Sequence, residues 1–454
     1  MRYLFPLVGA LALMAAPAAF AASSAVTAQG GIKTETWVNE PMPAGFSIQA
    51  TELEGPVFAD ARGRTLYRWP YDTMRVGTTG DGDNSSACDD VVTTKTAGMM
   101  APYPPGLDLP ELESRKSCAQ VWPPVLAKDG DKDVGNFTIF TRKDGRRQWA
   151  YDKHALYTSD LDQQPGDTLG ARTNGNGGDG PAERRTVGPA AAVPPAFSVE
   201  TTRRGRLVTT EAKFSVYVSD NDGAEKSNCV GACARDWVPM IAGATAQPQG
   251  EWTIFERAPG VRQWAFRKKP VYTRAKDVDT MSQQGSDEPG WHNVYMQIAP
   301  LPPKGFSFAN NEVGEAIVSP QGKTVYIYNC GDDSKDQLAC DFPAAPQVYR
   351  LAVCGGGNVE RCLKRWPYIP AAADAVSGSR SWSVMWINPK TGREAAKGAE
   401  GAISVWAFRQ RPVYTFEGDK EPGDINGNRT GEFNGRRNGF HAFLVRDDFF
   451  DNAN

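Results

Sequence analysis

The sequence predicts an all-β protein made of three tandem, small antiparallel modules with long loops and disulfides. Three observations lead to this fold class. A Trp-Ala-aromatic stretch occurs three times, and each time a tyrosine follows eight residues after the tryptophan. The bulky side chains of the stretch alternate with the period of a β-strand. A cysteine also stands four residues before a tryptophan three times along the chain, at Cys118, Cys233 and Cys362.

The repeated stretch predicts a β-hairpin. Its large apolar side chains stand at alternate positions, which indicates a strand with one buried face. We expect a four-residue turn, Asp152 to Ala155, between this strand and Leu156-Tyr157 in the first copy. Another aromatic strand precedes each hairpin, so each module contains at least a three-stranded meander. The alternating pairs are Trp149 and Tyr151, Trp264 and Phe266, and Trp406 and Phe408.

The module boundaries follow from a shared opening. Pro-Ala-Gly-Phe-Ser at 43–47 has related sequences at 195–198 and 303–307. From 118–162 to 233–277 every landmark is shifted by 115 residues without a gap, which indicates duplication. We expect a signal peptide at 1–21, a linker at 22–40, module 1 at 41–188 with a linker at 174–188, module 2 at 189–299 and module 3 at 300–454.

The N-terminus predicts export. Arg2, an apolar run at 4–16 and Ala19-Phe20-Ala21 have the order of a secretory signal, with cleavage expected after Ala21. No cysteine follows the signal, so we expect no lipid anchor, and no later segment reaches the roughly 20 apolar residues of a membrane span. A periplasmic or secreted protein is predicted. The net charge of −3 argues against nucleic acid as a partner.

Eight cysteines in an exported chain predict disulfides. Spacing guides the pairing, because each cysteine that precedes a tryptophan has a nearby cysteine upstream. Other connectivities stay open at this point. The expected pairs are Cys88 with Cys118, Cys229 with Cys233, Cys354 with Cys362, and Cys330 with Cys340.

A second motif, Tyr-x-aromatic-x-x-Asp, recurs through the chain. Two copies are complete, and three keep only the tyrosine and the aspartate. Tyr326 is followed by an aspartate one place late, at Asp332. The complete copies are Tyr67, Trp69, Asp72 and Tyr414, Phe416, Asp419; the partial ones are Tyr157 with Asp162, Tyr217 with Asp222, and Tyr272 with Asp277.

With Cys118 to Pro124 and Pro422-Gly423-Asp424, these motifs make the chain resemble a bacterial secreted repeat family, the predicted lipoproteins with a Yx(FWY)xxD motif. The resemblance covers most of the mature chain. It implies an exported repeat protein and no assigned biochemical activity. The chain differs from the family in having no lipid-bearing cysteine after the signal and in the degenerate motifs of module 2.

The motif has a structural interpretation and a functional one. The tyrosine and the aromatic at i+2 share one face of a strand and can pack together, and the aspartate beyond the strand can accept backbone N–H bonds of the following turn. Repetition at equivalent positions favours this structural role. In the alternative, the tyrosines and aspartates line a groove for a sugar or another stackable ligand.

Reactive groups are sparse. The three histidines form no repeated Ser-His-Asp set, and the cysteine spacing fits neither covalent haem nor zinc. Acidic runs at 81–84, 129–133 and 220–223 offer oxygen ligands for calcium, but none completes a twelve-residue loop, and solvated turns explain them. We therefore predict no catalytic residue, no metal site and no cofactor.

These observations favour a non-catalytic exported repeat protein that acts as a cell-envelope scaffold or ligand-binding module. Its partner is unknown and could be an envelope polymer or a protein. A carbohydrate binder that uses exposed aromatics is the first alternative. A hydrolase that uses module carboxylates such as Asp72 and Asp419 is the second, and a redox partner is a further one.

Overall fold

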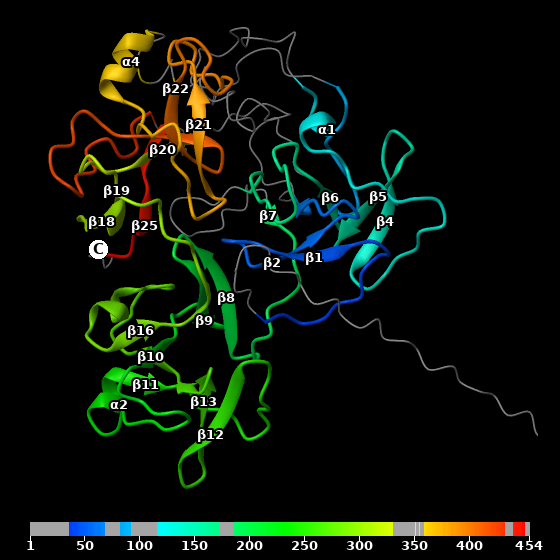
Figure 1. Ribbon diagram of the computed structural model, residues 1–454. Coiled ribbons are helices and arrows are strands. Elements are labelled where there is room, and N and C mark those ends of the chain that lie inside the picture. Colours follow the sequence, from blue (N-terminus) through cyan, green and yellow to red (C-terminus); the bar gives the residue numbers. More distant parts are fainter. Residues whose placement is uncertain are drawn as a thin grey trace, which may run out of the picture.

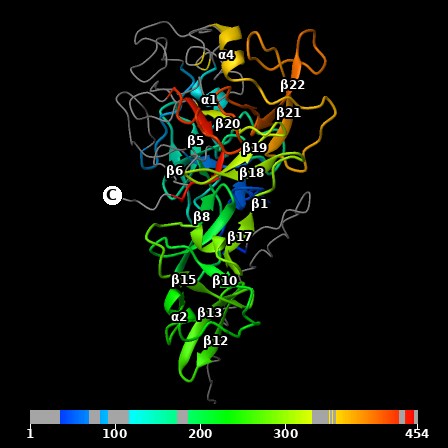
Figure 2. The same cartoon turned by 90° about the vertical axis from the view of Figure 1, so that its left-hand side faces the viewer.

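The computed structural model describes residues 36–68, 82–91, 116–171, 185–329, 350, 354, 358–431 and 439–449. These residues form mostly antiparallel strands with a few short helices, which confirms the predicted all-β class. Figure 1 shows three groups of strands, coloured blue to teal, green, and yellow to red. The green group extends away from the other two in both views (Figures 1 and 2). The division into three modules stays a prediction, and module 1, module 2 and module 3 here mean the predicted ranges 41–188, 189–299 and 300–454. The predicted signal peptide lies outside the described residues.

In module 1 a β-hairpin precedes a five-stranded sheet of order β4-β5-β6-β3-β7. The hairpin is β1 (Ser47–Ala50) and β2 (Pro56–Ala59). The strands of the sheet are β3 (Tyr67–Arg68), β4 (Phe137–Thr141), β5 (Arg147–Tyr151), β6 (His154–Tyr157) and β7 (Arg185–Thr186). The helix α1 (Cys118–Val121) lies between β3 and β4 in the chain.

In module 2 the corresponding strands form two sheets, β12-β13-β14 and β11-β15-β10-β16, beside the sheet β17-β9-β8. The elements are β8 (Phe197–Thr202), β9 (Gly205–Thr210), β10 (Tyr217–Ser219), α2 (Cys233–Asp236), β11 (Trp237–Pro239), β12 (Trp252–Ala258), β13 (Val261–Phe266), β14 (Lys269–Pro270), β15 (Tyr272–Arg274), the 3-10 helix η3 (Gln284–Asp287), β16 (Trp291–Asn293) and β17 (Tyr295–Ile298).

Module 3 repeats the sheet order of module 1 as β21-β22-β23-β20-β24, with a second sheet β18-β19-β25. The elements are β18 (Ser307–Asn310), β19 (Glu315–Val318), β20 (Tyr326–Asn329), α4 (Val359–Arg365), β21 (Trp382–Ile387), β22 (Ile403–Phe408), β23 (Arg411–Tyr414), β24 (Gly439–Ala442) and β25 (Leu444–Arg446).

The repeated hairpin turns are tighter than predicted. Tyr151 pairs with His154, so only Asp152 and Lys153 form the turn, and the four-residue turn expected at 152–155 is wrong. Both turn residues have positive φ, 45° and 68°. Two successive positive φ values define the type I′ turn, whose twist matches that of the flanking strands. Arg267-Lys268 and Arg409-Gln410 adopt the same conformation in the other two copies.

Both faces of the repeated strand are buried, whereas the sequence predicted one. Trp149 and Tyr151 pack in one cluster with Phe58 of the β1–β2 hairpin. Ala150 points to the opposite face and packs in a second cluster with Cys118 and the residues of α1. The small side chain of Ala150 leaves room for the disulfide layer on that face. Strand alternation was therefore predicted correctly, while the second covering layer was not.

The four-residue step from cysteine to tryptophan is one turn of helix. The N–H of Trp122 donates to the carbonyl of Cys118 at 2.7 Å, and Trp366 does the same to Cys362 at 2.7 Å. An i to i−4 hydrogen bond is the defining contact of an α-helix. The sequence analysis predicted no helix at these positions, and the structure corrects it. No described helix has the length and apolar character needed to cross a membrane.

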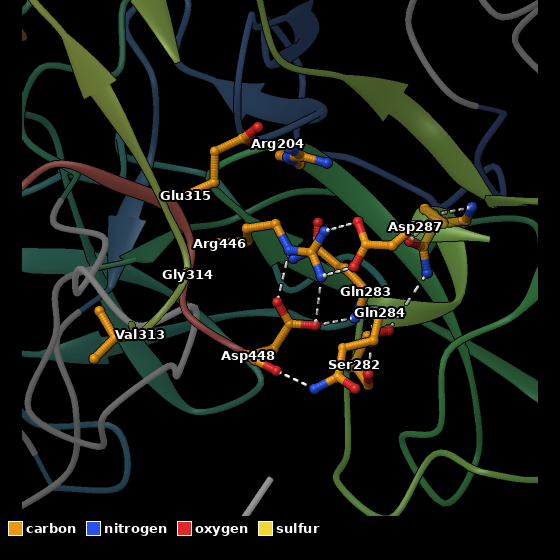
Figure 3. Close-up of polar contacts among 12 residues, drawn as sticks. Arg204, Ser282, Gln283, Gln284, Asp287, Val313, Gly314, Glu315, Arg446 and Asp448 are labelled. Atoms are coloured by element: carbon orange, nitrogen blue, oxygen red, sulfur yellow. Dashed lines mark hydrogen bonds and ion pairs between the residues drawn. The ribbon is translucent and has the colours of Figure 1, made fainter. Parts of the chain in front are cut away.

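Contacts between the modules are polar and specific. The carboxylate of Glu52 in module 1 accepts hydrogen bonds from the Ser379 hydroxyl at 2.7 Å and from the Arg380 N–H at 2.8 Å in module 3. Between modules 2 and 3, the guanidinium of Arg446 donates to Asp287 at 2.8 Å and 3.1 Å (Figure 3). Within module 3 it also donates to Asp448 at 2.7 Å. These bonds give the modules a defined arrangement.

Candidate functional site

The two motif tyrosines of each module lie directly opposite one another on paired antiparallel strands. Their Cα partners in the register are Tyr67 with Tyr157, Tyr217 with Tyr272, and Tyr326 with Tyr414. All six side chains are buried. The sequence did not indicate this pairing, because 55 to 90 residues separate the two motifs of a module. The structure therefore joins them into one cluster per module, here called the motif cluster.

Within each motif cluster the first tyrosine binds the aspartate of the second motif. The Tyr67 hydroxyl donates to Asp162 at 2.8 Å. The equivalent bonds are Tyr217 to Asp277 at 2.7 Å and Tyr326 to Asp419 at 2.8 Å. The aspartate of the second motif therefore binds the tyrosine of the first motif in every module.

The reverse bond is seen in module 2. The Tyr272 hydroxyl lies 2.7 Å from an oxygen of Asp222 and 2.7 Å from the hydroxyl of Ser227. Two crossed tyrosine–aspartate bonds therefore connect the two motifs of this module. In module 1 the corresponding Tyr157 contacts the Ser86 hydroxyl at 2.7 Å. The side chains of Trp69 and Asp72, which complete the first motif, lie outside the described residues, as does Asp332.

In three of the described motif aspartates, the second carboxylate oxygen accepts a backbone N–H from a following loop. Asp162 accepts the N–H of Leu169 at 2.9 Å, and Asp419 accepts the N–H of Asn426 at 3.0 Å. Asp222 accepts the N–H of Asn228 at 2.6 Å. The sequence predicted that these aspartates accept backbone N–H groups, but from the turn that directly follows the strand. The donors instead stand six or seven residues further on, so these three aspartates each join a strand end, a loop and the opposite tyrosine. The second oxygen of Asp277 instead accepts from the Arg274 guanidinium at 3.3 Å.

Burial sets the electrostatics of these clusters. It raises the pKa of Asp162 to about 7, against the lowering effect of the hydrogen bonds from Tyr67 and Leu169. Burial likewise raises the pKa of Asp277 and Asp419. The pKa of Tyr272 is raised to about 12, and burial is the largest cause. The hydrogen bond with Ser227 lowers this pKa, and the hydrogen bond to Asp222 raises it. The phenols therefore stay protonated donors at neutral pH.

The tryptophan after each cysteine packs on the first motif tyrosine. The ring centroids of Tyr67 and Trp122 lie 5.3 Å apart in an edge-to-face arrangement. The same geometry recurs at 5.3 Å for Tyr217 with Trp237 and at 5.1 Å for Tyr326 with Trp366. Phe416, the middle aromatic of a complete motif, packs against Trp366 at 4.5 Å. These contacts favour the structural interpretation of the motif aromatics.

The disulfides lie beside the motif clusters. Cys88 pairs with Cys118, Cys229 with Cys233, and Cys354 with Cys362, with Cα atoms 5.2, 5.2 and 4.9 Å apart. These are the pairs that the spacing predicted. Cys330 and Cys340 lie outside the described residues. Closing these loops restricts the unfolded chain, which typically stabilises a protein by roughly 2 to 4 kcal/mol per bridge.

Sequence reasoning missed an arginine that binds a buried glutamine in the first two modules. Gln148 is fully buried, accepts a bond from Arg142 and donates to the carbonyl of Leu156 at 2.8 Å. Gln263 repeats this with Arg257 at 2.9 Å. The available signal was the shared Gln-Trp-Ala sequence, since a polar residue before a core tryptophan needs a partner. Module 3 has Val405 at this position.

The acidic runs act as turns. In the run at 129–133, Asp131 accepts the N–H of Lys128 at 2.8 Å and Asp133 accepts that of Ile139 at 2.9 Å. Asp222 of the run at 220–223 belongs to a motif cluster. Among the described residues, no group of three or more His, Cys, Asp or Glu side chains is placed to hold a metal ion.

Tryptophan side chains are mostly in the core. Nine of them are buried, while Trp37 and Trp386 are half-buried and Trp69 lies outside the described residues. A sugar-binding platform needs an exposed ring face. Nine of the twelve tryptophans therefore pack inside the modules and offer no such face.

The comparisons with known proteins agree with the motif-based resemblance. The sequence model of a family described as a secreted repeat of unknown function matches residues 138–177. This range begins in β4 and includes Tyr157, Asp162 and the loop that Asp162 holds. The chain matches no curated protein and no solved structure. The resemblance to a secreted repeat is thereby confirmed, and the family description assigns no activity.

Proposed function

We propose that this protein is a non-catalytic exported repeat protein, a scaffold or ligand-binding module of the cell envelope. Each motif cluster stabilises the fold of its own module. One observation carries the proposal. The tyrosine–aspartate bond between the two motifs recurs in buried form in all three modules, at Tyr67–Asp162, Tyr217–Asp277 and Tyr326–Asp419. A repeated buried contact suits a structural role, because a catalytic group seldom recurs in every repeat.

The hydrolase alternative draws support from the raised pKa of Asp162, since general acids and bases often have shifted pKa values. Burial argues against it. The Asp162 residue is 9% exposed, and its two oxygens already accept hydrogen bonds from Tyr67 and Leu169. A general acid or base must reach the substrate within hydrogen-bond distance. An occupied, buried carboxyl does not offer that access.

Changing Asp162 to Asn tests the structural role through the pH dependence of stability. The unfolded carboxyl has its ordinary pKa of 3.8, and the folded carboxyl has a pKa raised to about 7. The folded state therefore binds the proton more tightly, so this group favours folding below about pH 4 and its contribution is lost as pH rises to about 7. We expect the free energy of unfolding of Asp162→Asn, relative to wild type, to rise across this window by up to about 4 kcal/mol.

The matched control is Asp160→Asn, two residues away, where the side chain is exposed and pairs with Lys116. Denaturant unfolding at pH 4, 5, 6 and 7 should show no comparable pH-dependent difference for this variant. An Asp162→Asn protein that keeps the pH profile of wild type while losing an activity towards an envelope polymer would contradict the structural role. Retention of wild type on peptidoglycan or polysaccharide would instead support the carbohydrate-binding alternative.

A further inference from the structure

A cavity of about 320 Å³ lies where the three modules meet. Module 1 contributes Leu53, and module 2 contributes the β8–β9 turn with Tyr295, Ile298 and Ala299. Module 3 contributes the remaining wall, which begins at Pro300. The module 3 wall is aromatic and aliphatic, with Trp382, Phe408, Phe443, Ile317 and Val445. Pockets of this size are at the lower end of those that hold small organic ligands. The volume accommodates roughly ten water-sized groups.

The cavity combines these apolar walls with a buried cation. Arg409 lines it and is 7% exposed. Its guanidinium donates to the carbonyl of Ala171 at 3.0 Å and forms an ion pair with Glu54. Within the part of the chain that the structure describes, the buried Nε of Arg409 has no hydrogen-bond partner. A buried donor without a partner is costly, so an acceptor at this position would stabilise the site.

Further charged side chains line the cavity beside Arg409. Arg203 and Arg204 line the cavity on the module 2 side, and Glu315 lines it on the module 3 side. Arg204 forms an ion pair with Glu315, and these two residues lie near the Arg446 network in Figure 3. The guanidinium of Arg203 lies 4.4 Å from the ring centroid of Phe443, within the cavity wall.

The mouth of the cavity is apolar and open to solvent. Ile298 at the end of β17 is 73% exposed, and Leu301 after this strand is 74% exposed. Phe308 of β18 is 41% exposed. Exposed large apolar side chains grouped at the entrance of a cavity mark a ligand path more often than scattered single ones. An amphipathic molecule could enter here with its apolar part against Trp382 and Phe408.

We propose that this cavity binds a small amphipathic carboxylate, with its apolar chain along the aromatic wall and its carboxylate accepting from Arg409 Nε. A charge-assisted bond to a buried guanidinium orients the ligand, and the apolar walls supply most of the affinity. The inference specifies the ligand-binding side of the proposed function, and it rests on the cavity rather than on the motif clusters. A failure here would leave the structural role of the motif intact.

The test is calorimetric titration of the full mature chain with sodium decanoate below its micellar concentration, and with decanol as the neutral probe. We expect one decanoate per chain and at least tenfold weaker binding of decanol. The double variant Arg409→Met, Glu54→Gln removes the cation without leaving a buried carboxylate unpaired. It should bind decanoate at least tenfold more weakly and decanol with unchanged affinity.

A second variant covers the case in which that double variant does not fold. Ala299 is a half-buried lining residue between β17 and module 3, outside every strand, so Ala299→Trp fills the cavity without interrupting a sheet. It should abolish decanoate binding while its circular dichroism spectrum stays that of wild type. Equal affinity for decanoate and decanol, decanoate binding that survives Ala299→Trp, or no heat of binding would each overturn the proposal.

Discussion

Replacing Glu54 with alanine should lower the free energy of unfolding by about 3 to 5 kcal/mol, because it leaves the Arg409 guanidinium buried without its counter-charge. Both side chains of this pair are 8% exposed, and the pair joins module 1 to module 3. Urea denaturation monitored by tryptophan fluorescence measures the loss. The variant Arg409→Met, Glu54→Gln should recover a large part of it, since two apolar or neutral side chains bury no lone charge.

The matched control for this pair is Asp160→Ala. Asp160 forms a 2.6 Å ion pair with Lys116, but the two side chains are 42% and 49% exposed. Solvent screens such a pair, so its loss should cost less than about 1 kcal/mol. If Glu54→Ala is no more destabilising than Asp160→Ala, the contact between modules 1 and 3 does not contribute to stability as described.

Replacing Trp366 with alanine should destabilise the protein by about 3 to 5 kcal/mol. The indole is fully buried and stacks on Phe440 with ring centroids 3.7 Å apart. It also packs edge-to-face on the motif tyrosine Tyr326 at 5.1 Å. The substitution leaves a cavity in the middle of the module 3 motif cluster, where the surrounding sheet and the Cys354–Cys362 bridge limit collapse.

Trp386→Ala provides the control, because Trp386 belongs to β21 of the same module and is only half-buried. Thermal and urea unfolding of both variants should show a clearly smaller effect at Trp386. An equal effect at the two positions would mean that tryptophan burial in general, rather than packing in the motif cluster, determines the stability of module 3.

Local patterns in the sequence were sufficient to predict the strands and the described disulfide pairs. Alternation placed Trp149 and Tyr151 on one face, and short loop spacing paired Cys229 with Cys233. These features depend on neighbours within a few residues. The helical turn that begins at Cys118 was overlooked because four residues is too short a segment to show helical periodicity.

Long-range contacts were not predictable in the same way. The bond between Tyr67 and Asp162 joins residues 95 apart, and either aspartate of the module was an equally good partner by sequence. The ion pair of Glu54 with Arg409 spans 355 residues. Nothing near either residue in the chain indicates the other. The cavity depends on contacts of this kind, because its walls come from three modules.

The central claim is that, in each module, the aspartate of the second motif binds the tyrosine of the first motif. Module 2 offers the most direct measurement, a pair of double-mutant cycles on the free energy of unfolding. The cycle of Tyr217→Phe with Asp277→Ala should give a coupling energy of about 1 to 2 kcal/mol, because the Tyr217 hydroxyl lies 2.7 Å from Asp277. The cycle of Tyr217→Phe with Asp222→Ala, within one motif, should give less than about 0.5 kcal/mol. Coupling inside the motif, or none in either cycle, would contradict the crossed arrangement.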